Sequence, residues 1–138
     1  MTPYYRALMR QPTRPLRVEE LRLIIKMLRG KPAENRLIDQ LHGALVRDML
    51  DGGMGSIWFQ GAKYGGHSEE LSEGAFRDTD GVPVSVVLLL DDSGNLLQLD
   101  FFKADGSPLV RYPESNEFEI IERHGQLGYP PPNAPQQG

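Results

Sequence analysis

Carboxylates are the residues of this chain whose type and spacing could do chemistry. Four of them surround one predicted hairpin: Asp91, Asp92, Asp100 and Asp105. Paired carboxylates can act as general acids and bases or bind divalent cations, but aspartates in hairpin loops more often stabilise the turn itself. Asp100 differs because it falls inside a predicted strand, where it either faces solvent or pairs with Lys103 or Arg111.

A glycine-rich loop, Asp51-Gly52-Gly53-Met54-Gly55-Ser56, joins two predicted strands. A phosphate-binding P-loop needs a lysine before the serine, and a dinucleotide-binding turn is followed by a helix. Neither condition is met here, so we expect a turn in which the glycines adopt positive φ. Met54 at its tip is then an exposed apolar contact, which indicates a binding surface.

The segment Asp78-Thr79-Asp80-Gly81 starts like a calcium-binding loop, but its twelfth position is Leu89 where the loop needs Glu. We therefore expect a hairpin turn. The three histidines, His42, His67 and His124, have no metal-ligand spacing, and the chain has no cysteine. No metal site, cofactor or catalytic residue is predicted. The candidate binding residues lie in the loops and turns, with one in a strand: Met54, Ser56, Asp80, Asp92, Asp100 and Asp105.

Two helices are predicted in the first third of the chain. The first, over residues 18–29, should bury one apolar stripe, made of Val18, Leu21, Ile24, Ile25 and Leu28. The second, over residues 34–41, should bury Leu37, Ile38 and Leu41.

Strand patterns follow the helices. They cover residues 45–50, 57–60, 71–78, 83–90 and 96–103, with a weaker candidate at 117–122. The run from Pro83 to Leu90 is almost wholly apolar, which is typical of a strand covered on both faces. Helices followed by a meander of strands indicate an α+β fold. We predict N-terminal helices packed on one face of an antiparallel sheet of about five strands, with the other face partly open.

The length of 138 residues suits one domain. We expect an irregular arm over residues 1–16, a single α+β domain over 17–124, and a flexible tail rich in Pro, Gln and Gly over 125–138. The longest apolar run, Val86 to Leu90, is too short to span a bilayer. A cytoplasmic protein without a membrane partner is the expectation.

The charge is divided unevenly along the chain. Residues 1–47 carry ten Lys and Arg against four acids, a net charge of +6, whereas residues 48–138 carry five against fifteen, a net charge of −10. The two parts could attract each other or simply be solvated. The acidic part could instead face a basic protein, where charge raises the association rate and the selectivity. Nucleic-acid binding is disfavoured because few aromatic residues accompany the basic part.

Three segments carry a family resemblance. They are residues 47–56 with a D-G-G-M-G-S loop, residues 78–84 with a D-x-D-G-x-x-V turn, and residues 95–109 with an L-D-x-x-K-x-D-x-S-P-L strand and exit. Over about residues 15–113 the chain resembles a bacterial family of small domains of unknown function. In size and style it is also similar to immunity proteins of toxin systems, an analogy that carries no motif.

Three functions remain open from the sequence. The first is a non-enzymatic protein-interaction domain, in its most specific form an immunity-type protein that neutralises a basic toxin. The second is a small-ligand or metal-dependent enzyme that uses the acidic turns, with Asp80, Asp100 and Asp105 meeting His67 in a pocket. The third is a structural or regulatory module that associates with itself through a sheet edge.

Overall fold

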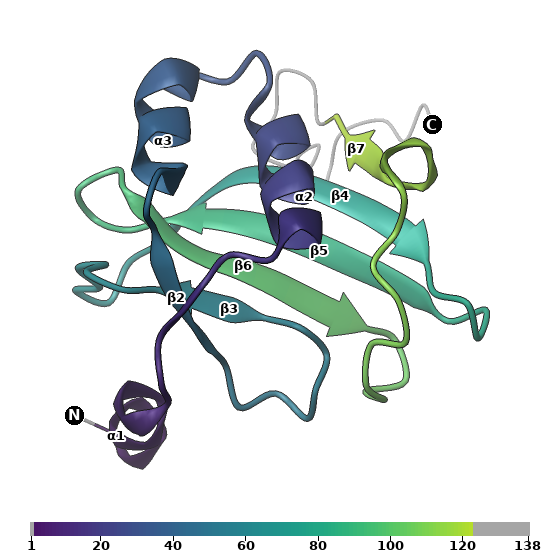
Figure 1. Ribbon diagram of the computed structural model, residues 1–138, viewed down its shortest axis with the longest axis horizontal. Helices are drawn as coiled ribbons and strands as arrows, with labels where there is room; N and C mark the ends of the chain where they lie inside the picture. Colours follow the sequence, from purple (N-terminus) through teal and green to yellow (C-terminus); the bar gives the residue numbers. More distant parts are fainter. Residues whose placement is uncertain (1, 123–138) are drawn as a thin grey trace, which may run out of the picture.

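A computed structural model describes residues 2–122 of the chain (Figure 1). Three helices, α1 (Pro3–Arg10), α2 (Val18–Leu28) and α3 (Glu34–Leu41), accompany the strands β1 (Arg14–Pro15), β2 (Leu45–Asp48), β3 (Ile57–Phe59), β4 (Glu69–Arg77), β5 (Pro83–Leu90), β6 (Leu96–Lys103) and β7 (Glu119–Ile121). A 3-10 turn, η1 (Ser115–Glu117), precedes β7. Within these residues no helix has the length and apolar character needed to cross a bilayer. The expected tail over 125–138 lies outside the described residues.

The strands form one antiparallel sheet in the order β1-β2-β3-β6-β5-β4-β7. The expected class, α+β, is the class observed, but the expected count of about five strands is wrong, because the sheet has seven. The two edge strands account for the difference. The weaker candidate at 117–122 corresponds to β7, whereas β1 was not expected, because its two residues give no recognisable alternation of apolar and polar residues.

Residues 2–16 hold α1 and β1, where an irregular arm was expected. Thr2 begins α1 by accepting a hydrogen bond from the amide of Tyr5. Pro3 occupies the first turn, where a missing N–H costs nothing. Leu8 is buried against Trp58 and Leu97, so α1 covers one end of the sheet.

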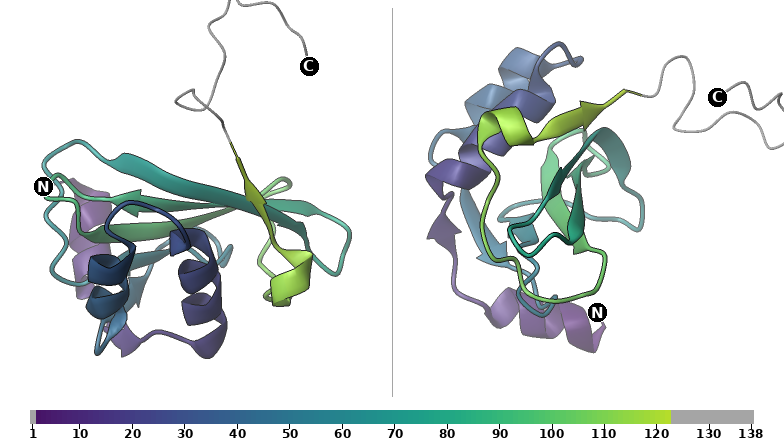
Figure 2. Two further views of the ribbon diagram at one scale, coloured as in Figure 1. Left: turned by 90° about the horizontal axis from the view of Figure 1, so that it is seen from above. Right: turned by 90° about the vertical axis from the view of Figure 1, so that its right-hand side faces the viewer.

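Helices α2 and α3 lie together on the opposite face of the sheet (Figure 2). The buried stripe of α2 differs from the expected one. Leu23, Ile24, Met27 and Leu28 are buried, whereas Val18 and Ile25 are exposed. This helix is apolar around most of its circumference, so periodicity alone did not fix its rotation. In α3, Leu37 and Leu41 are buried and Ile38 packs against the core, as expected.

The two faces of the sheet are unequally covered. Val84, Val86, Leu88 and Leu90 of β5 belong to the core under α2 and α3. The alternate residues of the same strand, including Val87 and Leu89, are partly exposed. The expectation that Pro83–Leu90 is covered on both faces is therefore wrong. We call the second side the open face and define it by the residues that the strand register places there: Glu70, Glu73, Ala75, Arg77, Pro83, Ser85, Val87, Leu89, Gln98, Asp100, Phe102, Glu119 and Ile121.

Candidate functional site

The glycine-rich loop after β2 is a closed turn. The carboxylate of Asp51 accepts hydrogen bonds from the amides of Gly53, Met54 and Ser56 at 3.2, 3.2 and 2.9 Å. Those amides therefore point at Asp51 and are not presented to a bound phosphate. Gly55 has φ +114°, and a side chain there would also press on Leu109 and Phe101 at 3.4 Å. The glycines serve a turn, as expected.

Met54 is partly buried in that loop, where an exposed tip was expected. Its sulfur accepts the amide N–H of Lys103 at 3.4 Å. Met54 thus fastens the loop to the end of β6.

Ser56 and Asp100 are the two predicted site residues that the structure brings together. The Ser56 hydroxyl donates to Asp100 Oδ1 at 3.0 Å, and Ser56 Oγ accepts the amide of Phe101 at 2.8 Å. These contacts tie Ser56 to the backbone and side chain of β6. Burial raises the pKa of Asp100, and the nearby charge of Asp51 adds to that rise while the Ser56 hydrogen bond opposes it. Asp100 pairs with neither Lys103 nor Arg111, so the alternative expectation, that one of them forms an ion pair with it, is wrong.

Lys103 instead binds the turn between β4 and β5. Its ammonium is fully buried and donates to Asp78 at 2.8 Å, Asp80 at 2.5 Å and the carbonyl of Pro108 at 3.0 Å. Asp78 also accepts the amides of Val110 and Arg111. This cluster ties three segments of chain together, so the expected turn at 78–81 has a structural role.

The predicted acidic residues do not converge on one place. Asp80 is held by Lys103 and Asp100 by Ser56. Asp105 is exposed and bonds to Ser107, while Asp92 is exposed in the β5–β6 turn. Between residues 2 and 122, no group of three or more His, Cys, Asp or Glu side chains could hold a metal ion.

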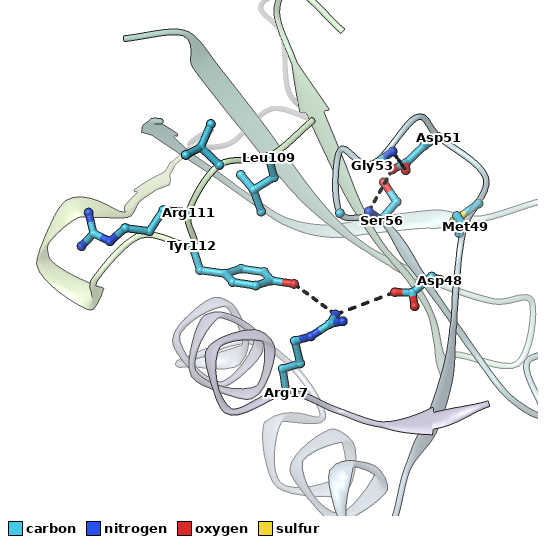
Figure 3. Close-up of a pocket in the computed structure, with 11 residues that line it drawn as sticks. Arg17, Asp48, Met49, Asp51, Gly53, Ser56, Leu109, Arg111 and Tyr112 are labelled. Carbon is cyan, nitrogen blue, oxygen red and sulfur yellow. Dashed lines mark hydrogen bonds and ion pairs between the residues drawn. The ribbon is translucent and has the colours of Figure 1, made fainter. Parts of the chain in front are cut away.

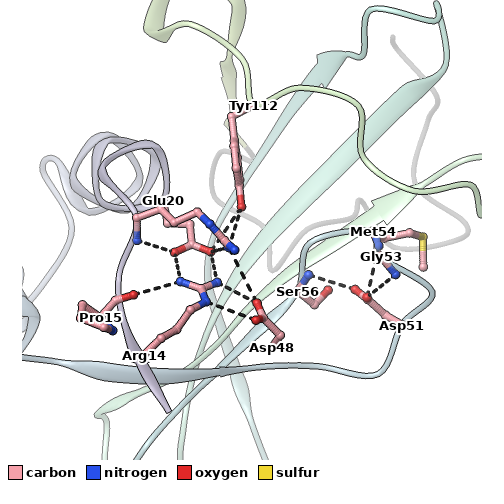
Figure 4. A network of polar contacts seen from close by, with 10 residues as sticks. Arg14, Pro15, Glu20, Asp48, Asp51, Gly53, Met54, Ser56 and Tyr112 are labelled. Atoms are coloured by element: carbon pink, nitrogen blue, oxygen red, sulfur yellow. Dashed lines mark hydrogen bonds and ion pairs between the residues drawn. The ribbon is translucent and has the colours of Figure 1, made fainter. Parts of the chain in front are cut away.

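A buried ionic network that sequence reasoning missed lies at the start of α2 (Figure 4). Glu20 is fully buried and accepts both terminal nitrogens of Arg14 at 2.9 and 2.8 Å. The same guanidinium reaches Asp48 at 3.2 and 2.7 Å. These bonds hold the pKa of Asp48 below its usual range. Glu20 also accepts a hydrogen bond from the backbone amide of Arg17. A glutamate three residues after the residue that precedes a helix is a known capping pattern, and it was the sequence signal that could have pointed to Glu20.

A cavity of about 400 Å³ opens beside this network (Figure 3). Its walls come from three parts of the chain: the start of α2, the loop after β2, and the segment that follows β6. The residues that line it are Arg17, Asp48, Met49, Asp51, Gly53, Gly55, Ser56, Leu109, Val110, Arg111 and Tyr112. Of the predicted site residues, Ser56 is the one on this wall.

The open face carries the second surface feature. Across it, Asp100 pairs in register with Val87, Val87 with Glu73, and Glu73 with Ile121. The next row runs from Phe102 through Ser85 and Ala75 to Glu119. Apolar side chains therefore alternate with carboxylates over several strands, and Phe102 is 57% exposed.

Comparison with known proteins gives one match. The family described as "Domain of unknown function (DUF6984)" matches residues 13–113. That range contains β1 to β6, the cavity walls and the Lys103 cluster, and it starts after α1 and ends before η1. No curated protein and no solved structure matches the chain. The chain belongs to the DUF6984 family of domains of unknown function.

Proposed function

We propose that this domain is a non-enzymatic protein-interaction domain that binds a basic partner protein through its open face. The observation that carries the proposal is the composition of that face. It holds four carboxylates, Glu70, Glu73, Asp100 and Glu119, against one cation, Arg77, among exposed or partly exposed apolar side chains. An antiparallel sheet can leave one face to solvent, but an exposed aromatic side chain with partly exposed apolar neighbours is the kind of surface that protein partners cover.

The form of the surface suits a protein better than a small molecule. The face is a sheet surface several strands wide, and it presents Phe102 as an aromatic anchor. Carboxylates around such an anchor steer a positively charged partner and reject a negatively charged one. The net charge of −10 over residues 48–138 acts in the same direction.

A more specific form of the proposal is immunity-type neutralisation of a basic toxin in a bacterial cell. It is supported by charge complementarity and by the small, rigid scaffold. Co-expression with a toxin encoded next to this protein should restore growth. The same rescue by a variant with a disrupted open face would contradict this form.

Binding is tested by isolating the partner from the native host at low salt and measuring its affinity for purified variants. Phe102→Ala should weaken binding by about tenfold or more, as expected of an aromatic anchor in an interface. Glu119→Lys should weaken it too, and more at low salt than at high salt, because screening reduces the charge effect.

Two matched controls separate the open face from general surface effects. Val18→Ala removes an apolar side chain with the same 57% exposure as Phe102, from the start of α2. Asp39→Lys makes the same charge change as Glu119→Lys, at an exposed position of α3. Both should leave affinity within about twofold. Equal losses in the controls and the open-face variants would overturn the assignment of this face, as would recovery of no protein partner.

A further inference from the structure

The cavity beside α2 is a separate feature from the open face, because its walls include the start of the helix that covers the other side of the sheet. At about 400 Å³ it falls within the size range of small-molecule sites. We propose that it binds a small organic monocarboxylate, with the carboxylate on Arg17 and a short apolar chain against Met49 and Leu109.

The two arginines of the network differ in how well their donors are used. Arg14 makes four contacts of 3.2 Å or less with Glu20 and Asp48. Arg17 approaches Glu20 at 3.4 Å, Tyr112 at 3.4 Å and Asp48 at 3.8 Å. Arg14 therefore takes the close positions on both carboxylates, and the guanidinium of Arg17 keeps donors that a ligand can use.

The position of Arg17 places those donors in the cavity. Its side chain is 48% exposed, and Figure 3 shows the guanidinium between Tyr112 and Asp48, toward the centre of the site. Arg111 lines the cavity as well, but its guanidinium points outward toward Glu114 and Glu117, at 3.9 and 3.4 Å. Arg17 is thus the cation that faces an incoming ligand.

Tyr112 supplies a second donor. Its hydroxyl makes two long contacts of 3.4 Å, one from Arg17 and one to Glu20. Burial and the charge of Glu20 raise the pKa of this phenol, so it stays protonated and able to donate at neutral pH. A carboxylate between Arg17 and Tyr112 would receive shorter hydrogen bonds than these groups now make within the protein.

The charge around the cavity favours a single negative charge over two. Arg111 is paired outside the cavity with Glu114 and Glu117, so Arg14 and Arg17 face three carboxylates, those of Glu20, Asp48 and Asp51. Asp51 is occupied by the three loop amides, and Asp48 by Arg14. A monocarboxylate brings one further negative charge into these surroundings, whereas a phosphate dianion brings two and is repelled more strongly. The apolar side chains Met49, Leu109 and Val110 then favour a ligand with a short hydrocarbon part.

The test titrates the purified protein with sodium hexanoate and follows backbone amide shifts by NMR. Shifts should concentrate on the residues around the cavity. Hexanamide, which has the same chain without the charge, should bind at least tenfold more weakly. Inorganic phosphate should also bind more weakly than hexanoate. Equal binding of hexanamide or phosphate would overturn the proposed chemistry, and saturation without shifts at the cavity would overturn the location.

Variants assign the binding to Arg17. Arg17→Gln should weaken hexanoate binding by about tenfold or more, since it removes a charge-assisted hydrogen bond. Arg17→Lys should weaken it less, because the charge remains. Arg22→Gln removes an exposed arginine five residues further along, within α2, and should change nothing.

Tyr112→Phe keeps the ring and removes the hydroxyl, so it tests the site even if Arg17→Gln fails to fold. It should weaken binding a few-fold. Unchanged hexanoate affinity in both Arg17→Gln and Tyr112→Phe would refute the proposal. The open-face variants should bind hexanoate normally, which keeps this result independent of the proposed protein partner.

Discussion

The ammonium of Lys103 lies out of solvent between Asp78 and Asp80, and a buried charge of this kind is stable only while it is paired. Burial would raise the pKa of Asp78, but the hydrogen bonds from Lys103 and from three backbone amides outweigh it and lower the pKa to about 2. For Lys103, burial would lower the pKa, but the two carboxylates outweigh it and raise it. Both shifts mean that the charged pair is favoured in the folded protein.

We expect Lys103→Met to lower the midpoint of urea unfolding at pH 7 by about 1 to 2 M, because it leaves Asp78 buried without its cation. The pH dependence gives a second signature. Asp78 contributes stability above its ordinary pKa of 3.8, and that contribution is lost as pH falls through about 2. The gap between wild type and variant should therefore be widest near neutral pH and should narrow as the pH approaches 2. A gap that is independent of pH would show that the pair does not act through charge.

Individual residues were predictable where their chemistry is local. Turn aspartates and positive-φ glycines follow from the loop sequences, as Asp51 and Gly55 illustrate. The contact between Ser56 and Asp100 spans 44 positions, and that between Arg14 and Asp48 spans 34. No spacing rule connects residues so far apart, so the ionic network and the cavity needed the fold.

At the level of elements, β4 and the segment that enters β7 depend on one glycine. A Cβ added to Gly74 would lie 2.2 Å from the ring of Phe118, which is buried over this point of the strand. Gly74 therefore provides space for an aromatic ring, and its φ is not in the left-handed region.

Gly74→Ala should lower the free energy of unfolding by about 1 to 3 kcal/mol, because the ring or the strand has to move. Ser72→Ala is the matched control on the same face of β4. It should cost less than about 0.5 kcal/mol, because Ser72 Oγ has no hydrogen-bond partner among residues 2–122.

A double-mutant cycle links the effect to Phe118. In the Gly74→Ala background, Phe118→Leu should cost less than it does in the wild type, with a coupling energy of about 1 kcal/mol or more. Denaturant unfolding measures all four proteins. Additive costs would show that Gly74 is required for some reason other than space for the ring.

Length alone did not decide which elements were predictable, since α1 and α3 both have eight residues and only α3 was expected. The long strands β5 and β6 agree with the expected residues 83–90 and 96–103. The two-residue β1 could not be predicted from the sequence, because Arg14 and Pro15 form a strand only through their pairing with β2. The irregular arm expected over residues 1–16 contains α1, whose Pro3 lies in the first turn, where a helix tolerates proline.

For the whole molecule, helices on one face of the sheet and a partly open second face agree with the expectation, but the expected covering of β5 on both faces is wrong. The apolar run of β5 predicts burial on both faces, yet α2 and α3 cover one face and α1 covers one end of the other. A strand that is apolar on its exposed side is more apolar than folding alone requires. These additional apolar side chains on the open face are the reason for assigning it to a partner protein.

Two adjacent valines of β5 test this sidedness directly, since Val86 points into the core and Val87 toward the open face. Val86→Ala should cost about 2 to 3 kcal/mol, from two lost methyl groups and the space they leave. Val87→Ala should cost less than about 1 kcal/mol, because a partly exposed side chain loses less burial and leaves no closed cavity. Unfolding by urea at dilute protein concentration measures both. Equal costs would mean that the open face is already covered in solution. Sedimentation at the same concentration would then distinguish a second copy of the chain from the basic partner that we propose.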